Sequence, residues 1–281
     1  MGTAEFHELK PMLEGIELIT IDERQGRLEM ARRRMAENGL DAVFLEAGST
    51  LDYFTGVRWG RSERMTAAVL PANGEIAYVC PAFEEARLRE MLLFGDDVRG
   101  WEEHESPFER VAGILSDRGA ERGRIGMEES VRFFLANGIR RALPGAEIVS
   151  AEPATIPARG LKSTAEIALI QRAMEITAEA FKACIARLHE GMSQAEFGEL
   201  SVAAHKALGA DGHITVQFGT SSAFPHGSRE MTYLMEGDVV LMDGGCTIEG
   251  YHSDISRTVV FGEPTDRQRE IWALEQTAQA A

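Results

Sequence analysis

The sequence predicts an α/β domain followed by a region in which two helices precede a β-hairpin. Short strand and helix patterns alternate between residues 22 and 149, which is typical of an α/β domain. Two capping boxes, Ser163–Glu166 and Ser193–Glu196, each open a helical pattern. Residues 239–261 then resemble two strands around a tight turn at Gly250. These three observations predict the fold class.

Composition and charge exclude several classes of protein. The chain has 281 residues, enough for one large or two ordinary domains. Its net charge of −16 argues against nucleic-acid binding, which needs a basic surface. No apolar run approaches the ~20 residues of a membrane span. The three cysteines, Cys80, Cys184 and Cys246, form neither a zinc motif nor a disulfide framework. We therefore expect a cytoplasmic protein with reduced thiols.

The elements of the α/β region follow from hydrophobic periodicity and from turn residues. A helix is predicted over about 22–38, ended by Asn38-Gly39. A β-hairpin is predicted over 66–79, with its turn at 71–74. The remaining predicted strands are 41–45, 124–127 and 147–149, and the remaining predicted helices are 83–93, 108–115 and 133–143.

A proline-bearing stretch, 152–157, is predicted to connect two domains, residues 1–157 and residues 158–281. After it, helices are predicted from Ser163 to about His189 and from Ser193 to about Leu208. A strand over 214–218 follows, and then a loop over 219–227 that carries His226.

Two aspartates stand out in the C-terminal hairpin. A turn centred between Ile248 and Glu249 places Asp243 directly opposite Asp254, with Cβ atoms about 5 Å apart on one face. Carboxylates in that position repel each other unless a metal ion or a shared proton lies between them. The alternative is that both are turn residues, solvated or bonded to backbone. For Asp243 that alternative is weaker, because it follows four apolar residues of an expected buried strand.

Three segments carry a family resemblance: Phe224-Pro-His226-Gly, Asp243-Gly-Gly, and Gly250-Tyr-x-Ser-Asp254-Ile-x-Arg-Thr. Together they resemble the metal-binding region of the creatinase-fold metallopeptidases, which include Xaa-Pro dipeptidase (prolidase) and aminopeptidase P. The resemblance implies an α/β creatinase-like N-terminal domain followed by an incomplete α+β pita-bread catalytic domain. It also implies that Asp243 and Asp254 bind a pair of divalent metal ions, Mn²⁺, Co²⁺ or Zn²⁺, and that His226 stabilises the oxyanion.

The other candidate residues are less constrained. Strand alternation puts His252 on the face of Asp254, so it is a candidate lining residue of the site. His213 is undecided. Cys246 is either a soft ligand or a packed thiol. His189 and His205 fall on predicted helices, where surface or packing roles are expected.

The sequence departs from the family in one respect. The family's later ligands, a histidine and two glutamates, have no counterpart between His252 and Ala281, so we expect a chain truncated within its catalytic domain. The implied function is metal-dependent hydrolysis of the bond preceding proline in a peptide, by a homodimer. The alternatives are an inactive fragment or pseudoenzyme serving as a binding or dimerisation module, and a metal-free creatinase-like amidinohydrolase.

Overall fold

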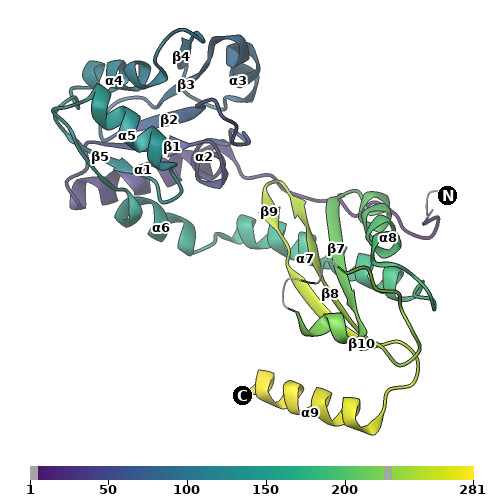
Figure 1. The fold of residues 1–281 in the computed structure, drawn as a ribbon. Helices are drawn as coiled ribbons and strands as arrows, with labels where there is room; N and C mark the ends of the chain where they lie inside the picture. Colours follow the sequence, from purple (N-terminus) through teal and green to yellow (C-terminus); the bar gives the residue numbers. More distant parts are fainter. Residues whose placement is uncertain (1–5, 225–226, 228–229) are drawn as a thin grey trace. The chain divides into compact units, whose positions relative to one another are not determined.

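The structure, a computed structural model, describes residues 6–224, 227 and 230–281 (Figure 1). The chain divides into two compact units. The first unit is Ile19–Ser163, and the second combines Thr164–Ala281 with the residues that precede Ile19. This division does not test the domain limits predicted from the sequence, 1–157 and 158–281, and they stay a prediction.

The first unit is built on a six-stranded mixed sheet with the order β4-β3-β2-β1-β5-β6. Its strands are β1 (Ala42–Glu46), β2 (Ala67–Pro71), β3 (Ala77–Pro81), β4 (Asp97–Trp101), β5 (Arg124–Met127) and β6 (Glu147–Ser150). β2 is antiparallel to both β1 and β3, and the other neighbours are parallel. The predicted hairpin is therefore confirmed as β2–β3.

Helices cover both faces of this sheet because its central strands bury side chains on both sides. α1 (Ile21–Glu37), α2 (Ser49–Thr55), α3 (Glu85–Met91) and α6 (Glu152–Gly160) pack on the face that carries Val43 and Leu45. α4 (Pro107–Asp117) and α5 (Phe133–Ala142) pack on the face that carries Phe44. A short 3-10 helix, Ala82–Glu84, precedes α3. The result is a three-layer α/β unit.

α6 corrects the sequence prediction, because residues 152–157 form a helix rather than a connection. Pro153 falls in the first turn, where a missing N–H costs little. Pro157 lies inside the helix and forfeits one backbone hydrogen bond. Burial of Ala154 and Ala158, together with a bond of 2.5 Å from the Tyr53 hydroxyl to the Ala158 carbonyl, holds the segment helical. Tertiary packing thus overrides the local proline signal.

The second unit contains a smaller antiparallel sheet. Its elements are α7 (Thr164–Ile185), α8 (Gln194–Ala207), β7 (Asp211–Phe218), a 3-10 helix (Gly219–Ala223), β8 (Val239–Ile248), β9 (Tyr251–His252), β10 (Ile255–Val260) and α9 (Asp266–Ala280). The strand order is β10-β8-β7, with β9 also paired to β8. The two predicted helices are confirmed as α7 and α8.

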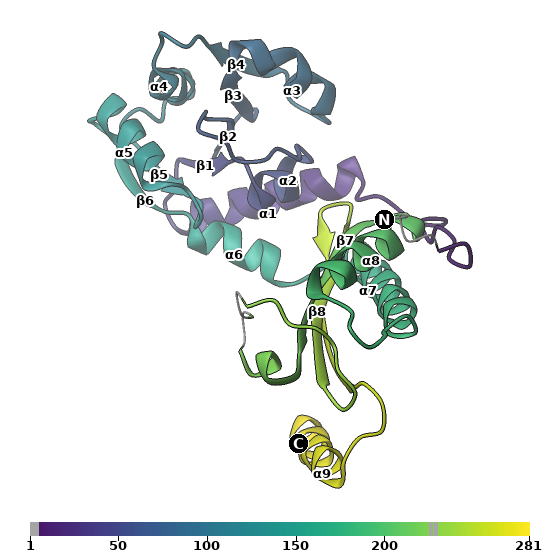
Figure 2. The ribbon, with the colours of Figure 1, turned by 45° about the vertical axis from the view of Figure 1, so that its right-hand side comes forward.

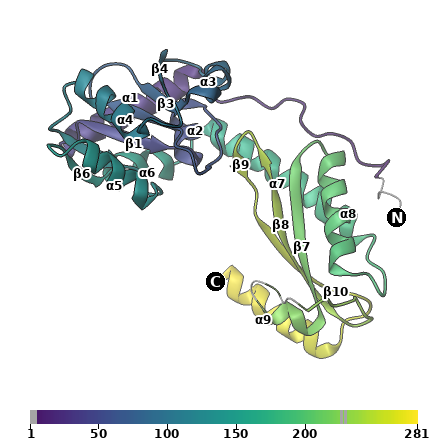
Figure 3. The same cartoon turned by 45° about the horizontal axis from the view of Figure 1, so that its top comes forward.

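α7 and α8 pack against one face of this sheet (Figure 3). Ile214, Val216 and Met242 are buried beneath them. α8 also closes the outer edge of β7, because Ser201 Oγ accepts a hydrogen bond of 3.0 Å from Ile214 N and Gln194 Nε2 donates to the Val216 carbonyl at 3.2 Å. Neither α7 nor α8 packs against the opposite face of the sheet.

α9 follows β10 and has no buried residue (Figure 2). Its first turn is fixed by a capping box between Thr265 and Gln268. Across the described ranges of the chain, every helix is either too short or too polar to cross a membrane.

Candidate metal centre

The hairpin turn lies one residue later than predicted, between Glu249 and Gly250. Ile248 pairs with Tyr251, and Thr247 pairs with His252. The two central residues have φ values of 51° and 82°, and a two-residue type I′ turn requires positive φ at both positions. Glutamate rarely adopts this left-handed conformation.

The new register separates the two aspartates along the strands. Asp243 pairs with Ser256, and Ile255 pairs with Gly244, so Asp254 falls opposite Gly245. The prediction that Asp243 and Asp254 are directly opposed is therefore wrong. Because side chains alternate with a period of two, the displacement by two positions keeps both aspartates on one face. They are diagonal neighbours, at a typical Cα separation of about 7–8 Å.

That face of the sheet is open to solvent, and we call it the open face. Its side chains alternate with the buried ones beneath α7 and α8. Its exposed members are Asp211, His213, Thr215, Asp243, His252, Asp254, Ser256 and Thr258. The expected buried strand before Asp243 buries only one of its two faces, and Asp243 lies on the other face, where it is exposed.

No cationic side chain among the described residues forms an ion pair with either carboxylate. Asp243 Oδ1 accepts a hydrogen bond of 2.6 Å from Ser256 Oγ, and Thr215 Oγ1 donates to the Asp243 carbonyl at 2.9 Å. Among the residues that the structure describes, neither Asp243 nor Asp254 forms an ion pair, and the Asp254 carboxylate accepts no hydrogen bond. Two uncompensated carboxylates on one face favour a bound cation.

The donor set fits a hard divalent cation, for which carboxylate oxygens are suitable ligands. It is also sparse. Within the described residues, no group of three or more histidine, cysteine, aspartate or glutamate side chains is arranged to hold a metal ion. As predicted metal ligands, Asp243 and Asp254 would therefore supply part of a coordination sphere rather than all of it.

The two glycines after Asp243 are required by the close approach of neighbouring backbone. A Cβ atom at Gly244 would lie 2.2 Å from the His213 carbonyl oxygen. A Cβ atom at Gly245 would lie 1.9 Å from the Ser253 carbonyl oxygen. Real Cβ atoms do not approach backbone this closely, so any larger residue would force the strands apart. The two glycines of the Asp-Gly-Gly segment thus allow the backbone of the neighbouring strands to approach β8 closely beside Asp243.

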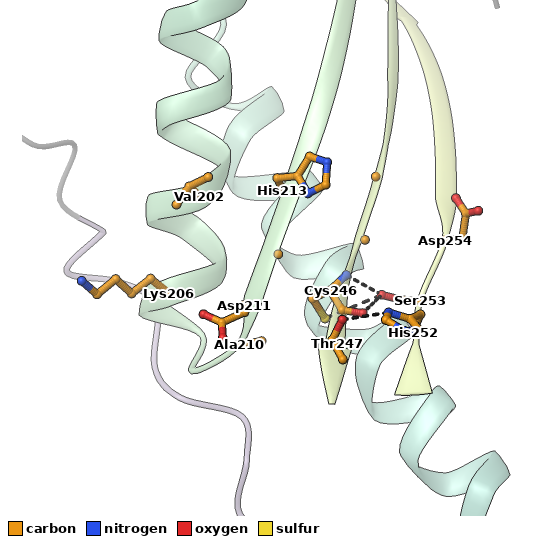
Figure 4. Close-up of a pocket in the computed structure, with 13 residues that line it drawn as sticks. Val202, Lys206, Ala210, Asp211, His213, Cys246, Thr247, His252, Ser253 and Asp254 are labelled. Carbon is orange, nitrogen blue, oxygen red and sulfur yellow. Dashed lines mark hydrogen bonds between the residues drawn. The ribbon is translucent and has the colours of Figure 1, made fainter. Parts of the chain in front are cut away.

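A hollow of about 770 Å³ lies beside Asp254 in the second unit (Figure 4), and Asp243 is not among the residues that line it. Side chains from α8, β7, β8 and β9 line it, among them Lys206, Asp211, His213, Thr247, His252 and Asp254. The His252 ring is fixed by a contact of 2.8 Å between its Nδ1 and Thr247 Oγ1. The hollow offers room for a small ligand next to the Asp254 carboxylate.

The histidine and cysteine candidates from the sequence differ in their location. His252 shares the face of Asp254, as alternation predicted, and its role stays a prediction. His226 lies outside the described residues. His213, left undecided by the sequence, pairs with Gly245 and so shares a row of the open face with Asp254. Cys246 is buried, and its thiol lies 3.4 Å from both Thr177 Oγ1 and the Ala173 carbonyl oxygen.

Two further residues of the site, Thr215 and Ser256, were missed. Counting by twos from Asp254 would have placed Ser256 on the same face. Thr215 gives no such local signal, because it reaches Asp243 only through the pairing of β7 with β8.

Comparisons with known proteins identify the family and the fold. A family model described as "Creatinase/Prolidase N-terminal domain" matches residues 27–160, and one described as "Metallopeptidase family M24" matches residues 168–281. A probable dipeptidase PepE of Mycobacterium tuberculosis is 30% identical over 273 residues, covering 91% of this chain and 68% of that protein. An Xaa-Pro dipeptidase of Lactobacillus delbrueckii is 29% identical over 265 residues, covering 90% of this chain and 70% of that protein.

The solved structure of dipeptidase PepE from Mycobacterium ulcerans has a TM-score of 0.85 at 27% identity, covering 94% of this chain and 72% of that one. The present chain spans 62% to 71% of the length of four curated relatives. The predicted resemblance and the predicted fold class, a creatinase-like α/β domain followed by a pita-bread domain, are both confirmed. The chain belongs to metallopeptidase family M24.

Proposed function

We propose that this chain contributes to a metal-dependent peptidase of the Xaa-Pro dipeptidase or aminopeptidase P type, which hydrolyses the peptide bond preceding proline. One observation carries the proposal: Asp243 and Asp254 lie on one open face without a cationic partner among the described residues. The relatives named as dipeptidases support the substrate class.

Each residue has a proposed task. Asp243 and Asp254 would bind two divalent ions, Mn²⁺, Co²⁺ or Zn²⁺, which when bound polarise a carbonyl group and lower the pKa of a water molecule. Ser256 orients the Asp243 carboxylate by its hydrogen bond. His226 would donate a hydrogen bond to the oxyanion, a role that rests on the family resemblance. His252 and His213 would face the substrate from the hollow.

The cellular compartment and the oligomeric state are proposed on other grounds. All three cysteines are free and buried, which suits the reducing cytoplasm. A homodimer follows from the family resemblance alone, and size-exclusion chromatography with light scattering tests it.

A non-catalytic binding or dimerisation module is the alternative, and one observation favours it. The described residues bring no third metal-type side chain to the two aspartates. A metal-free amidinohydrolase is disfavoured, because the open carboxylate pair would then have no partner.

The test is hydrolysis of an Xaa-Pro dipeptide with added Mn²⁺, compared with an Xaa-Ala dipeptide of the same N-terminal residue. We expect cleavage of the proline peptide only, abolished by a chelator and by Asp254→Asn. Manganese-dependent turnover of both peptides would contradict the proline specificity. Manganese binding without turnover of either peptide would favour the binding module.

A further inference from the structure

The ladder between β8 and the returning strand is interrupted at Ser253 and Asp254. Thr247 pairs with His252 on one side of the gap, and Gly244 pairs with Ile255 on the other. Counting inward from either side assigns Cys246 to Ser253 and Gly245 to Asp254. No residue is inserted, so the interruption is not a β-bulge. Its cause must lie in the hydrogen bonds of Ser253.

In a regular antiparallel ladder, a hydrogen-bonded pair exchanges two N–H···O=C bonds. Ser253 N donates to the Cys246 carbonyl at 3.0 Å, as this pattern requires. The reciprocal bond is different, because Cys246 N donates to the Ser253 hydroxyl, Oγ, at 2.8 Å. The Ser253 side chain therefore takes the place of the Ser253 carbonyl in the ladder.

The displaced carbonyl lies against Gly245. A Cβ atom there would be 1.9 Å from the Ser253 carbonyl oxygen, so only glycine leaves room for it. This carbonyl belongs to the peptide group that joins Ser253 to Asp254. Its rotation out of the ladder therefore sets the backbone direction from which the Asp254 side chain leaves the strand.

The hydroxyl is held firmly in this role. Ser253 Oγ lies 2.7 Å from Thr177 Oγ1 of α7, and Ser253 is 6% exposed whereas Thr177 is fully buried. Figure 4 shows the Ser253 side chain turned toward Cys246, whereas the Asp254 carboxylate points away from it. Ser253 thus connects α7, which packs on one face of the sheet, with Asp254, whose side chain lies on the open face.

We propose that Ser253 is a positioning residue for Asp254: its hydroxyl replaces its own carbonyl in the ladder, and the released peptide group aims the Asp254 carboxylate at the site it shares with Asp243. The inference rests on the proposed function, because it takes Asp254 to be a metal ligand. It predicts that the hydroxyl, rather than the volume of the side chain, controls metal affinity.

The test uses a matched pair of substitutions in the full chain, Ser253→Thr and Ser253→Val. Threonine and valine have nearly the same shape, so any steric cost is shared, and only threonine keeps the hydroxyl. In calorimetric titration with Mn²⁺ alone, we expect Ser253→Val to bind 10–100-fold more weakly than Ser253→Thr, the range typical of residues that orient a ligand. Thr55→Val is the control for loss of a buried hydroxyl, because Thr55 is fully buried in the first unit, where its Oγ1 donates to the Leu51 carbonyl. This variant should keep the affinity within about threefold of the unmodified chain.

A metal-free measurement accompanies the titration. NMR coupling across hydrogen bonds should connect Cys246 N to the carbonyl of residue 253 in Ser253→Val and not in Ser253→Thr. Equal Mn²⁺ affinity of the two variants, or a ladder that stays interrupted in Ser253→Val, overturns the inference. Asp254→Asn separates the two hypotheses: if that change leaves Mn²⁺ binding intact, the proposed metal site fails. If it abolishes binding while the Ser253 pair bind equally, only the positioning role fails.

Discussion

Ser256 and Asp243 lie directly opposite each other on β10 and β8, and the Ser256 hydroxyl donates a hydrogen bond of 2.6 Å to Asp243 Oδ1. The bond fixes one carboxylate oxygen and leaves the other for a ligand. A serine so placed limits the rotation of a ligand without contacting the metal itself.

Replacing Ser256 by alanine should therefore weaken Mn²⁺ binding about 10–100-fold. The free energy of unfolding should change by less than about 0.5 kcal/mol, because the residue is exposed. Thr258→Ala is the control, since Thr258 is exposed on the same face two pairs further along and opposes Leu241. Equal affinity of the two variants would show that the bond does not orient Asp243.

The elements of the first unit could largely be predicted from the sequence because their apolar patterns are strong. β1 is buried on both faces and reads as a continuous apolar run, whereas α4 shows helical spacing. β4 escaped prediction because Asp97, Arg99 and Gly100 interrupt any such pattern. Its charges are balanced only in the folded state, where Asp97 pairs with Arg99 and Arg118.

The candidate site was predictable in part. Alternation placed Asp243 and Asp254 on one face. This prediction holds although the predicted register was wrong, because the pairing is displaced by two residues and side chains alternate with a period of two. The register itself depended on Glu249, whose left-handed conformation contradicts its ordinary preference. His213 and Thr215 reach the site by pairing between strands about 30 residues apart, and no local pattern reports such pairing.

The strained turn gives a second prediction, on stability. Asparagine tolerates positive φ, so Glu249→Asn should raise the free energy of unfolding by about 0.5–1 kcal/mol. Glu249→Val should lower it by at least about 1 kcal/mol, because β-branched residues oppose this conformation. Urea denaturation of the three proteins gives the order. A valine variant as stable as the asparagine variant would mean that the turn relaxes to another geometry.

A third prediction concerns acid stability and follows from His205. The residue is fully buried, Nδ1 lies 2.9 Å from the Ser201 carbonyl, and Nε2 has no partner within the described residues. Burial lowers the pKa of His205 below its ordinary value of 6.5, and nearby His213 lowers it further. The unfolded chain therefore binds a proton more readily, so stability is present above pH 6.5 and is lost as pH falls toward the folded-state pKa.

We expect His205→Gln to remove this contribution, which has a slope of at most about 1.4 kcal/mol per pH unit. The measurement is the urea midpoint between pH 5 and 8, compared between variant and parent. His189→Gln is a control of opposite sign, because hydrogen bonds to Glu190 and Glu196 raise the pKa of exposed His189. Stability from His189 is present below pH 6.5 and fades as pH rises through the folded-state pKa. Parallel curves for His205→Gln and the parent would refute the assignment.

The last prediction separates a metal-ligand role from a structural role for the aspartates. Asp243→Asn and Asp254→Asn remove a negative charge and keep the shape. If both residues bind metal, the metal-free variants should melt at the parent temperature or slightly above it, because repulsion between the carboxylates is relieved. Mn²⁺ affinity and Xaa-Pro hydrolysis should fall together by orders of magnitude. Even the parent chain should bind weakly if it relies on these two ligands, and tight binding of two ions would reveal donors outside the described residues.

Asp96→Asn is the matched control for these two changes. Asp96 is exposed in the first unit, between α3 and β4, and does not line the hollow. Its substitution should leave affinity and turnover near the parent values. If the aspartates instead serve only the fold, Asp243→Asn should cost about 1 kcal/mol of stability by weakening the hydrogen bond from Ser256, and both variants should retain activity. That outcome would remove the metal assignment, because a residue that coordinates the catalytic ion cannot lose its charge without loss of turnover.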